Sequence, residues 1–153
     1  MVRLTDGRFL IFSEGRDNDD PYSPVLLFAG DPAVAGTPVT VLRYRRPVGY
    51  RVTDADLLAD GRLILLQRRA TLLEGFSARI AVADLPALRP GATIAGREIA
   101  ALGAPLTVDN MEALSVAREG GRTIVRIASD DNFMPIQRTL LLEFALVERG
   151  PAR

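Results

Sequence analysis

Short apolar runs separated by polar turns fill the chain, and three stretches share one layout. Each begins with a glycine-containing turn, continues through an apolar run typical of a strand, and ends in polar residues. The three stretches are Thr5–Glu14, Ala59–Arg68 and Glu119–Asp130. Their turn glycines are 54 and 60 positions apart. A unit of this length, close to the roughly 50 residues of a kelch-type blade, predicts a repeat architecture.

Further apolar segments flank each copy and complete a four-stranded unit. A polar loop feeding a short strand precedes the second and third copies, at 53–58 and 109–116. A third strand follows each copy, and a fourth, outer strand follows the first two. The third strands are expected at Val25–Phe28, Ala78–Ala83 and Thr139–Leu146, and the fourth strands at Pro38–Tyr44 and Thr93–Ile99. The first copy lacks an innermost strand in this reading, because the chain begins close to its Asp-Gly turn.

Short strands, Asp-Gly turns and a fixed period predict an all-β, β-propeller-like fold with about three four-stranded antiparallel blades. The approximate blades are 1–50, 51–105 and 106–148, and 149–153 is a tail. Helix is limited to one turn at most, in 85–91. An ordinary antiparallel sandwich is the alternative, which the aligned repeats disfavour. Because propellers close with about 4–8 blades, we expect an open arc or an arc completed by association.

Composition removes several classes of function. The 153 residues contain no histidine and no cysteine, and all 19 basic residues are arginine. This excludes histidine-dependent triads, thiolate or imidazole zinc sites, and lysine chemistry. The net charge is zero, so we expect no nucleic-acid partner. No apolar run approaches the ~20 residues of a membrane helix, and the first residues do not form a signal peptide.

Two oxygen-rich clusters remain for chemistry. Asp109, Asn110 and Glu112 precede the third copy's first strand, and Asp130, Asp131 and Asn132 end its second strand. Antiparallel neighbours bring these two positions to the same end of a blade. Carboxylate and amide oxygens are the ligands of hard cations, so this end predicts a divalent cation site, most consistent with calcium.

Turn formation is the alternative for each residue of these clusters, since Asp and Asn stabilise turns through their own backbone. For the set as a whole a functional site is favoured, because Glu112 is not a turn residue. A second acidic stretch, 17–20, reads as a solvated loop, with Glu14 kept as a candidate. Arginines recur at the same end, and their fork suits a phosphate or carboxylate, although ion pairing with the nearby acids explains them equally well. These arginines are Arg16, Arg68, Arg69 and Arg138.

The same residues carry a family resemblance. The chain resembles the bacterial phytase-like family, described by an esterase-like activity of phytase. The matching segments are Asp109-Asn110-Met111-Glu112, Ser129 to Phe133, Gln137 to Leu142, Gln67-Arg68-Arg69 and Gly75 to Ile80. The chain departs from the family pattern at Gln67, where a Glu is usual, and at Ala113, where a Gly is usual.

The resemblance implies a six-bladed propeller of which this chain is the C-terminal half. It also implies export to the periplasm or the medium. The partner would then be the missing N-terminal half of the same protein, or a second copy in a homodimer. A small anionic substrate is expected, with no membrane partner.

Residues and resemblance together predict a metal-dependent phosphoester or ester hydrolase. A divalent cation, calcium first, would activate water in the central channel. The expected catalytic residues are Glu112, Asp131 and Arg138, and the substrate-binding residues are Arg68, Arg69 and Arg138. The expected metal ligands are Asp109, Asn110, Glu112, Asp130, Asp131 and Asn132. A non-catalytic binding propeller with a structural ion, and a lactonase-like sugar-acid hydrolase, are the alternatives.

Overall fold

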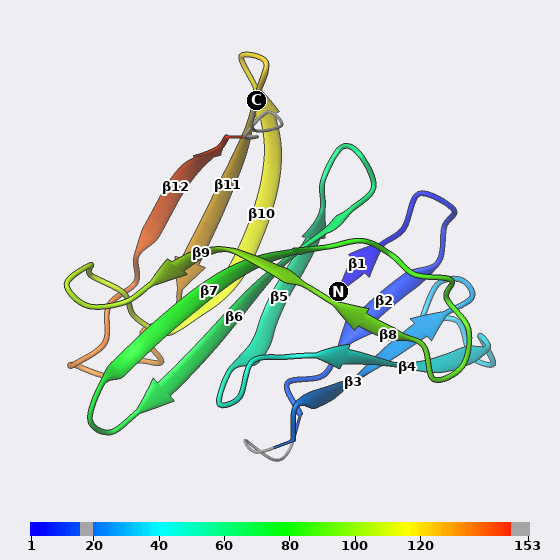
Figure 1. Cartoon of the computed structure of the whole chain (residues 1–153), viewed down its shortest axis with the longest axis horizontal. Coiled ribbons are helices and arrows are strands. Elements are labelled where there is room, and N and C mark those ends of the chain that lie inside the picture. Colours follow the sequence, from blue (N-terminus) through cyan, green and yellow to red (C-terminus); the bar gives the residue numbers. More distant parts are fainter. Residues whose placement is uncertain (16–19, 148–153) are drawn as a thin grey trace, which may run out of the picture.

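The computed structural model describes residues 1–15 and 20–147 and shows three separate sheets that fan out side by side (Figure 1). Their strand pairs are antiparallel except for one parallel pair at the edge of the first sheet. No described residue is helical, and 85–91 runs as a loop. The described residues therefore include no helix able to span a membrane. Three sheets arranged in this way form the propeller-like, all-β fold expected from the repeats. Part of the acidic stretch 17–20, Arg16 and the tail 149–153 lie outside the described residues.

The three sheets are called blades 1, 2 and 3 in chain order. Blade 1 holds β1 (Val2–Arg3), β2 (Phe9–Phe12), β3 (Tyr22–Phe28), β4 (Val39–Arg45) and β8 (Thr93–Ala95). Blade 2 holds β5 (Arg51–Leu57), β6 (Leu63–Thr71), β7 (Gly75–Ala83) and β9 (Arg97–Leu102). Blade 3 holds β10 (Met111–Glu119), β11 (Arg122–Ser129) and β12 (Leu141–Leu146).

Blade 1 contains an innermost strand, β1, although the sequence pattern predicted that this strand is missing. The strand β1 is only two residues long, and Val2 pairs with Leu10 while Arg3 pairs with Phe9. Val2 is 3% exposed, so burial of one side chain holds this short segment against β2. The expectation of a missing inner strand was wrong because two residues are too few to show an alternating pattern.

The single outer strand expected at Thr93–Ile99 was also wrong. The chain divides at Gly96: β8 runs parallel to β4 in blade 1, and β9 forms the outer edge of blade 2. A Cβ on Gly96 would lie 2.9 Å from the Tyr44 hydroxyl oxygen and 3.0 Å from the Ala81 Cβ. Only glycine allows the chain to cross this closely between the two blades.

Successive side chains of β6, the second strand of blade 2, belong alternately to two hydrophobic cores. Leu63 and Leu65 belong to the core shared with blade 1, whereas Ile64 and Leu66 belong to the core shared with blade 3. All four side chains are fully buried. Successive strand residues point to opposite faces of a sheet, so an unbroken apolar run is what a strand covered on both faces requires.

Two carboxylates join the inner strands of blades 2 and 3. Asp54 accepts a hydrogen bond from the Leu114 N–H, and Asp56 accepts one from the Val116 N–H, each at 2.8 Å. Both N–H groups lie on the edge of β10 that faces away from β11. The aspartates thus satisfy backbone donors of a strand edge and fix the position of blade 3 against blade 2.

Candidate functional site

The polar residues meet at one end of the blades, around a β-bulge in β10. The bulge lies between Met111 and Ala113, so Glu112 stands out of the regular pairing. Blade 2 has a bulge at the same place, between Val52 and Asp54, where Thr53 takes the position of Glu112. Bulges re-aim a side chain and are common beside functional sites. Equivalent β-bulges thus carry a threonine in blade 2 and a glutamate in blade 3.

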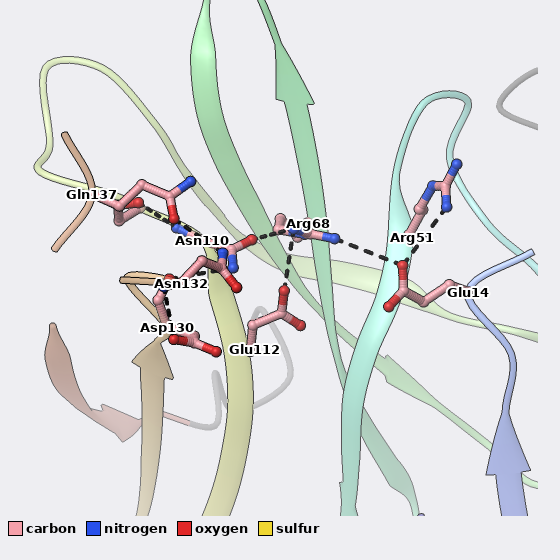
Figure 2. A network of polar contacts seen from close by, with 9 residues as sticks. Glu14, Arg51, Arg68, Asn110, Glu112, Asp130, Asn132 and Gln137 are labelled. Carbon is pink, nitrogen blue, oxygen red and sulfur yellow. Dashed lines mark hydrogen bonds and ion pairs between the residues drawn. The ribbon is translucent and has the colours of Figure 1, made fainter. Parts of the chain in front are cut away.

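Arg68 is the centre of this cluster (Figure 2). Its guanidinium donates a hydrogen bond to the Asn110 side-chain oxygen and lies 3.1 Å from a Glu112 carboxylate oxygen. The same guanidinium lies 3.7 Å from Glu14, which Arg51 also approaches at 3.7 Å. Arg68 therefore connects residues from all three blades.

The repeat explains why these residues meet. Glu14, Arg68 and Asp130 occupy equivalent positions: Glu14 and Asp130 follow the ends of β2 and β11, and Arg68 lies in the last part of the longer β6. Neighbouring blades place equivalent positions side by side. A basic residue between two acidic ones gives an alternating row of charge across the blades.

Burial raises the pKa of Glu112, in spite of the ion pair with Arg68. The loss of water around the carboxylate is the largest influence, followed by the opposing attraction of Arg68. Glu14 and Asp130 add repulsion, and Asn110 provides a hydrogen bond that favours the charged form. A raised pKa favours proton transfer near neutral pH and is a recurrent property of catalytic carboxyl groups.

Asp109 and Asn110 are buried, at 7% and 2% exposure, and they hold the backbone of the site. The Asp109 carboxylate accepts hydrogen bonds from the N–H groups of Asn110 and Arg138, at 2.8 and 2.9 Å. Asn110 exchanges bonds with Asp130: its side-chain amide donates to the Asp130 carbonyl, and its own carbonyl accepts from the Asp130 N–H. These two residues position the β10 entry against the loop after β11.

The loop that follows β11 is a compact turn. Asp130 accepts a hydrogen bond from the Asn132 N–H, and Asp131 accepts bonds from the Phe133 N–H and the Thr139 hydroxyl. Asn132 donates from its side chain to Gln137. Asn132 and Phe133 have φ of 48° and 56°, a left-handed backbone that this network holds in place. The turn interpretation therefore describes the contacts that Asp131 and Asn132 make in the structure.

The other two expected anion-binding arginines lie away from Arg68. Arg69 points to the opposite face of β6, where it pairs with Glu74 and lies over the Tyr50 ring. Arg138 is exposed, and its backbone N–H is the group that binds Asp109. Of the predicted residues, the structure brings together Arg68, Asn110, Glu112 and Asp130, and places Asp109 directly behind them.

Most oxygens of the predicted cation ligands already have partners. Both carboxylate oxygens of Asp109 and of Asp131 accept hydrogen bonds, and the Asn110 oxygen accepts from Arg68. Among the described residues, no three Asp or Glu side chains group closely enough to hold a metal ion. The six predicted ligands of this chain do not fit a single cation cage, and Arg68 supplies positive charge where such a cation was expected.

Two contributors were hard to find in the sequence. Glu14 was kept as a candidate, but its role beside Arg68 follows only from the repeat. Arg51, which approaches Glu14, carries no motif of its own. Gln67, where the family usually has Glu, turns away from the cluster: it is 1% exposed and donates to the Tyr44 hydroxyl at 2.8 Å, inside the junction of blades 1 and 2. The presence of Gln67 in place of the family's usual Glu therefore does not change the residues of the Arg68 cluster.

A separate cavity lies in the wedge between the outer parts of blades 2 and 3. It has a volume of ≈ 880 Å³ and an apolar wall that includes Ile80, Ile99 and Phe144. None of the polar cluster residues lines it. The chemistry of the Arg68 cluster, rather than the size of this wedge, marks the candidate site.

Comparison with known proteins identifies one matching family. The family model named Phytase-like, with the description "Esterase-like activity of phytase", matches residues 1–133. The match covers all three blades up to the loop after β11. No curated protein and no solved structure matches the chain. A propeller-like fold, a polar cluster across its blades and a family match over most of the length lead to one conclusion: the chain belongs to the phytase-like family.

Proposed function

We propose that this chain forms part of the channel site of a hydrolase that cleaves anionic esters, phosphoesters foremost. Arg68 binds the anionic group of the substrate, and Glu112 transfers the proton. The observation that carries the proposal is the position of Arg68, whose partly exposed guanidinium contacts a carboxyl group with a raised pKa. Family membership supports a hydrolase-like propeller as its general class.

The contacts of Arg68 differ in strength, and this difference provides a place for substrate. Asn110 and Glu112 hold the guanidinium from blade 3 at hydrogen-bonding distance, whereas Glu14 is 47% exposed and stands 3.7 Å away. Exposed ion pairs at such a distance contribute about 0–1 kcal/mol. A phosphate or carboxylate group displaces Glu14 at little cost and gains charge-assisted bonds with Arg68.

Glu112 then acts on water beside the bound ester. Its carboxylate accepts a proton from water as the water oxygen bonds to the phosphorus or carbonyl carbon. The bond to the leaving oxygen breaks, and the proton passes from Glu112 to that oxygen. The raised pKa suits both halves of this transfer. Arg138 and Asp131 belong to the proposal as rim groups, with Arg138 as an additional cation for the substrate.

Two residues of this chain are proposed as calcium ligands. Glu112 interacts with Arg68 and Asn110, and Asp130 accepts the Asn132 N–H at one of its two carboxylate oxygens. These two carboxylates would hold a divalent cation together with ligands from outside this chain. A bound cation supplies polarisation of the ester oxygen and charge neutralisation. Export to the periplasm or the medium also stays a proposal, based on family resemblance.

Replacement of Arg68 by Met tests the anion site, and Arg69→Met is the matched control because it removes the same group from the opposite face of β6. We expect Arg68→Met to abolish the binding of inorganic phosphate measured by calorimetry, and Arg69→Met to retain it. Glu14→Gln should tighten phosphate binding, because it removes the competing carboxylate. Equal phosphate affinity in wild type and Arg68→Met would contradict the proposal.

Hydrolysis is tested on 4-nitrophenyl phosphate, 4-nitrophenyl acetate and a sugar lactone, each with and without calcium. Glu112→Gln should lower the rate about 10²–10⁴-fold on the substrate that is cleaved, the usual contribution of a positioned acid–base group. The lactone distinguishes a sugar-acid hydrolase from a phosphoesterase. Full activity in Glu112→Gln would exclude Glu112 as the proton-transfer group.

A non-catalytic binding module is the second candidate. The hydrogen bonds that satisfy Asp109, Asn110 and Asp131 favour it, because a network already closed on itself is suited to hold a ligand or to stabilise the blade end. Phosphate binding that depends on Arg68, without hydrolysis of any of the three substrates, would support this candidate.

A further inference from the structure

The two outer faces of the three-blade arc are uncovered, and they differ in character. We call the face of a blade that looks toward the preceding blade its back, and the face toward the next blade its front. The back of blade 1 and the front of blade 3 have no neighbour in the described part of the chain. The two internal junctions show what each kind of face looks like when it is buried.

The back of blade 1 has the residue pattern of a buried junction. Phe9 and Ile11 are equivalent to Leu63 and Leu65, which lie 54 positions later and are fully buried against blade 1. The pairing of strands extends these residues into two cross-strand rows. The rows are Phe9–Phe28–Val39 and Ile11–Leu26–Val41.

These rows are open to solvent in the single chain. Val39 and Val41 are 47% and 56% exposed, and the four other side chains are only partly covered. In blades 2 and 3 the preceding blade covers the equivalent second-strand positions, which are Leu63, Leu65, Val125 and Ile127. The outer-strand position of blade 2 that is equivalent to Val41 is occupied by Glu98, which is exposed. A large uncovered apolar face of this kind marks an interface. The occupant that fits the repeat is therefore the front of another blade.

The front of blade 3 offers such a face, with small side chains where the back of blade 1 has large ones. Its cross-strand rows are Ala117–Ile124–Ala145, Ser115–Arg126–Glu143 and Ala113–Ala128–Leu141. Alanines at the contact leave room for the phenylalanines and aliphatic residues of the other face. Close packing between sheets depends on this kind of size complementarity.

Charge disfavours the symmetric alternative. The back of blade 1 carries Arg3, Arg43 and Arg45, and the described strands of blade 1 contain no acidic residue. The front of blade 3 carries Glu119 and Glu143 together with Arg122 and Arg126, so its charges balance. Two backs of blade 1 placed together would bring arginines against arginines, whereas a front against a back brings a neutral face against them.

We propose that two copies of this chain associate head to tail, the front of blade 3 of each packing on the back of blade 1 of the other. A heterologous contact repeated by a twofold axis closes into a ring. The ring has six blades, within the usual range of about 4–8 for a closed propeller. Each copy then faces the channel with its own Arg68, Glu14 and Glu112, so the complete site contains both.

This junction is weaker than the two internal ones. The internal fronts place the pairs Leu10–Leu27 and Ile64–Val82 where the front of blade 3 places Arg126–Glu143. The front of blade 3 also has Ala113 and Ser115 where blade 2 has the aspartates that bind the β10 N–H groups. The dimer therefore dissociates on dilution before the blades unfold.

Light scattering after size-exclusion chromatography of the full chain tests the proposal. We expect twice the chain mass of 16.6 kDa at high concentration and a shift toward the single mass on dilution. Val41→Arg disrupts the back of blade 1, and Ala128→Arg disrupts the front of blade 3. Leu72→Arg is the control, because Leu72 is fully exposed in the β6–β7 turn, away from both faces.

Each substitution alone should shift the dimer toward monomer at least tenfold in dissociation constant, and Leu72→Arg should not. Mixing the two variants should restore part of the dimer, because a mixed pair has one intact junction. Circular dichroism confirms that the variants are folded. A wild-type chain that stays monomeric at high concentration overturns the proposal. So does a dimer that Val41→Arg breaks and Ala128→Arg does not, since that result indicates a blade 1 to blade 1 contact.

Discussion

Blades 2 and 3 have the same inner three strands and the same inner-strand bulge, yet their equivalent positions carry different chemistry. At the bulge, blade 2 has Thr53 and blade 3 has Glu112; at the equivalent point beyond the bulge's partner residues, blade 2 has Arg68 within β6 and blade 3 has Asp130 after β11. The repeat makes these positions equivalent, so the difference in chemistry comes from the side chains. A cation from one blade meets carboxyl groups from its neighbours, and the cluster exists only because the two blades differ.

The largest expected contrast between these blades concerns burial. Ile80 in blade 2 and Leu141 in blade 3 are equivalent third-strand positions on the front faces, but they are 4% and 71% exposed. Ile80→Ala should lower the free energy of unfolding by about 2–5 kcal/mol, because it leaves a cavity in the junction. Leu141→Ala in the isolated monomer should change it by less than about 0.5 kcal/mol. Urea denaturation at low protein concentration measures both.

The aspartate contacts give the next contrast. Asp54→Ala and Asp56→Ala should each cost about 1–3 kcal/mol, because each leaves a β10 N–H without its acceptor. The equivalent change in blade 3, Ser115→Ala, should have little effect on the monomer. Hydrogen exchange gives a local check: the Leu114 and Val116 amides should lose protection in the respective Asp variants. Unchanged protection would mean that these bonds do not contribute to the junction.

The smallest expected effect is on the pH dependence of stability, to which one carboxyl group in each blade contributes with opposite sign. The raised pKa of Glu112 means that the folded chain binds its proton more tightly than the unfolded chain. The stabilising effect is then complete below the ordinary carboxyl pKa of 4.5 and is lost as pH rises through the folded pKa. Glu112→Gln should therefore become relatively more stable than wild type as pH increases from acid to neutral.

Asp60 in blade 2 provides the opposite case. Its hydrogen bonds with Arg62 lower the pKa of the carboxyl group below its ordinary value of 3.8. Its stabilising effect is present above that value and is lost as pH falls through the folded pKa. Asp60→Asn should therefore be relatively less stable than wild type at neutral pH, and the difference should vanish in acid. Thermal unfolding across this pH range measures both variants, and the same sign for both would contradict the account.

The fold could be predicted from the sequence because the Asp-Gly-Arg turns and the apolar runs recur at a nearly constant spacing. Asp6 and Asp60 bind the backbone and guanidinium of Arg8 and Arg62 in the same way, so one local signal marks two blades. The strand exchange at Gly96 could not be predicted, because it depends on the close approach of Tyr44 and Ala81. Periodicity also does not reveal which blade an outer strand joins.

The candidate site could be predicted only in part. The clusters around Asn110 and Asp130 were found because antiparallel strands place the start of one beside the end of the next. The sequence did not indicate that Arg68 points toward them while Arg69 points away, since that choice depends on which face of β6 meets blade 3. Nor did it indicate that Asp109 directs one of its carboxylate oxygens at the backbone N–H of Arg138, 29 residues later.

The aspartates between β5 and β10 also control the width of the space at the centre of the fan. Two strands that paired directly would lie about 4.7–4.9 Å apart and merge into one continuous sheet. A carboxylate inserted between them acts as a spacer: it satisfies the N–H groups of β10 while keeping the two inner strands farther apart than a ladder would. The width of the space between the inner strands of blades 2 and 3 is thus determined by two side chains of β5.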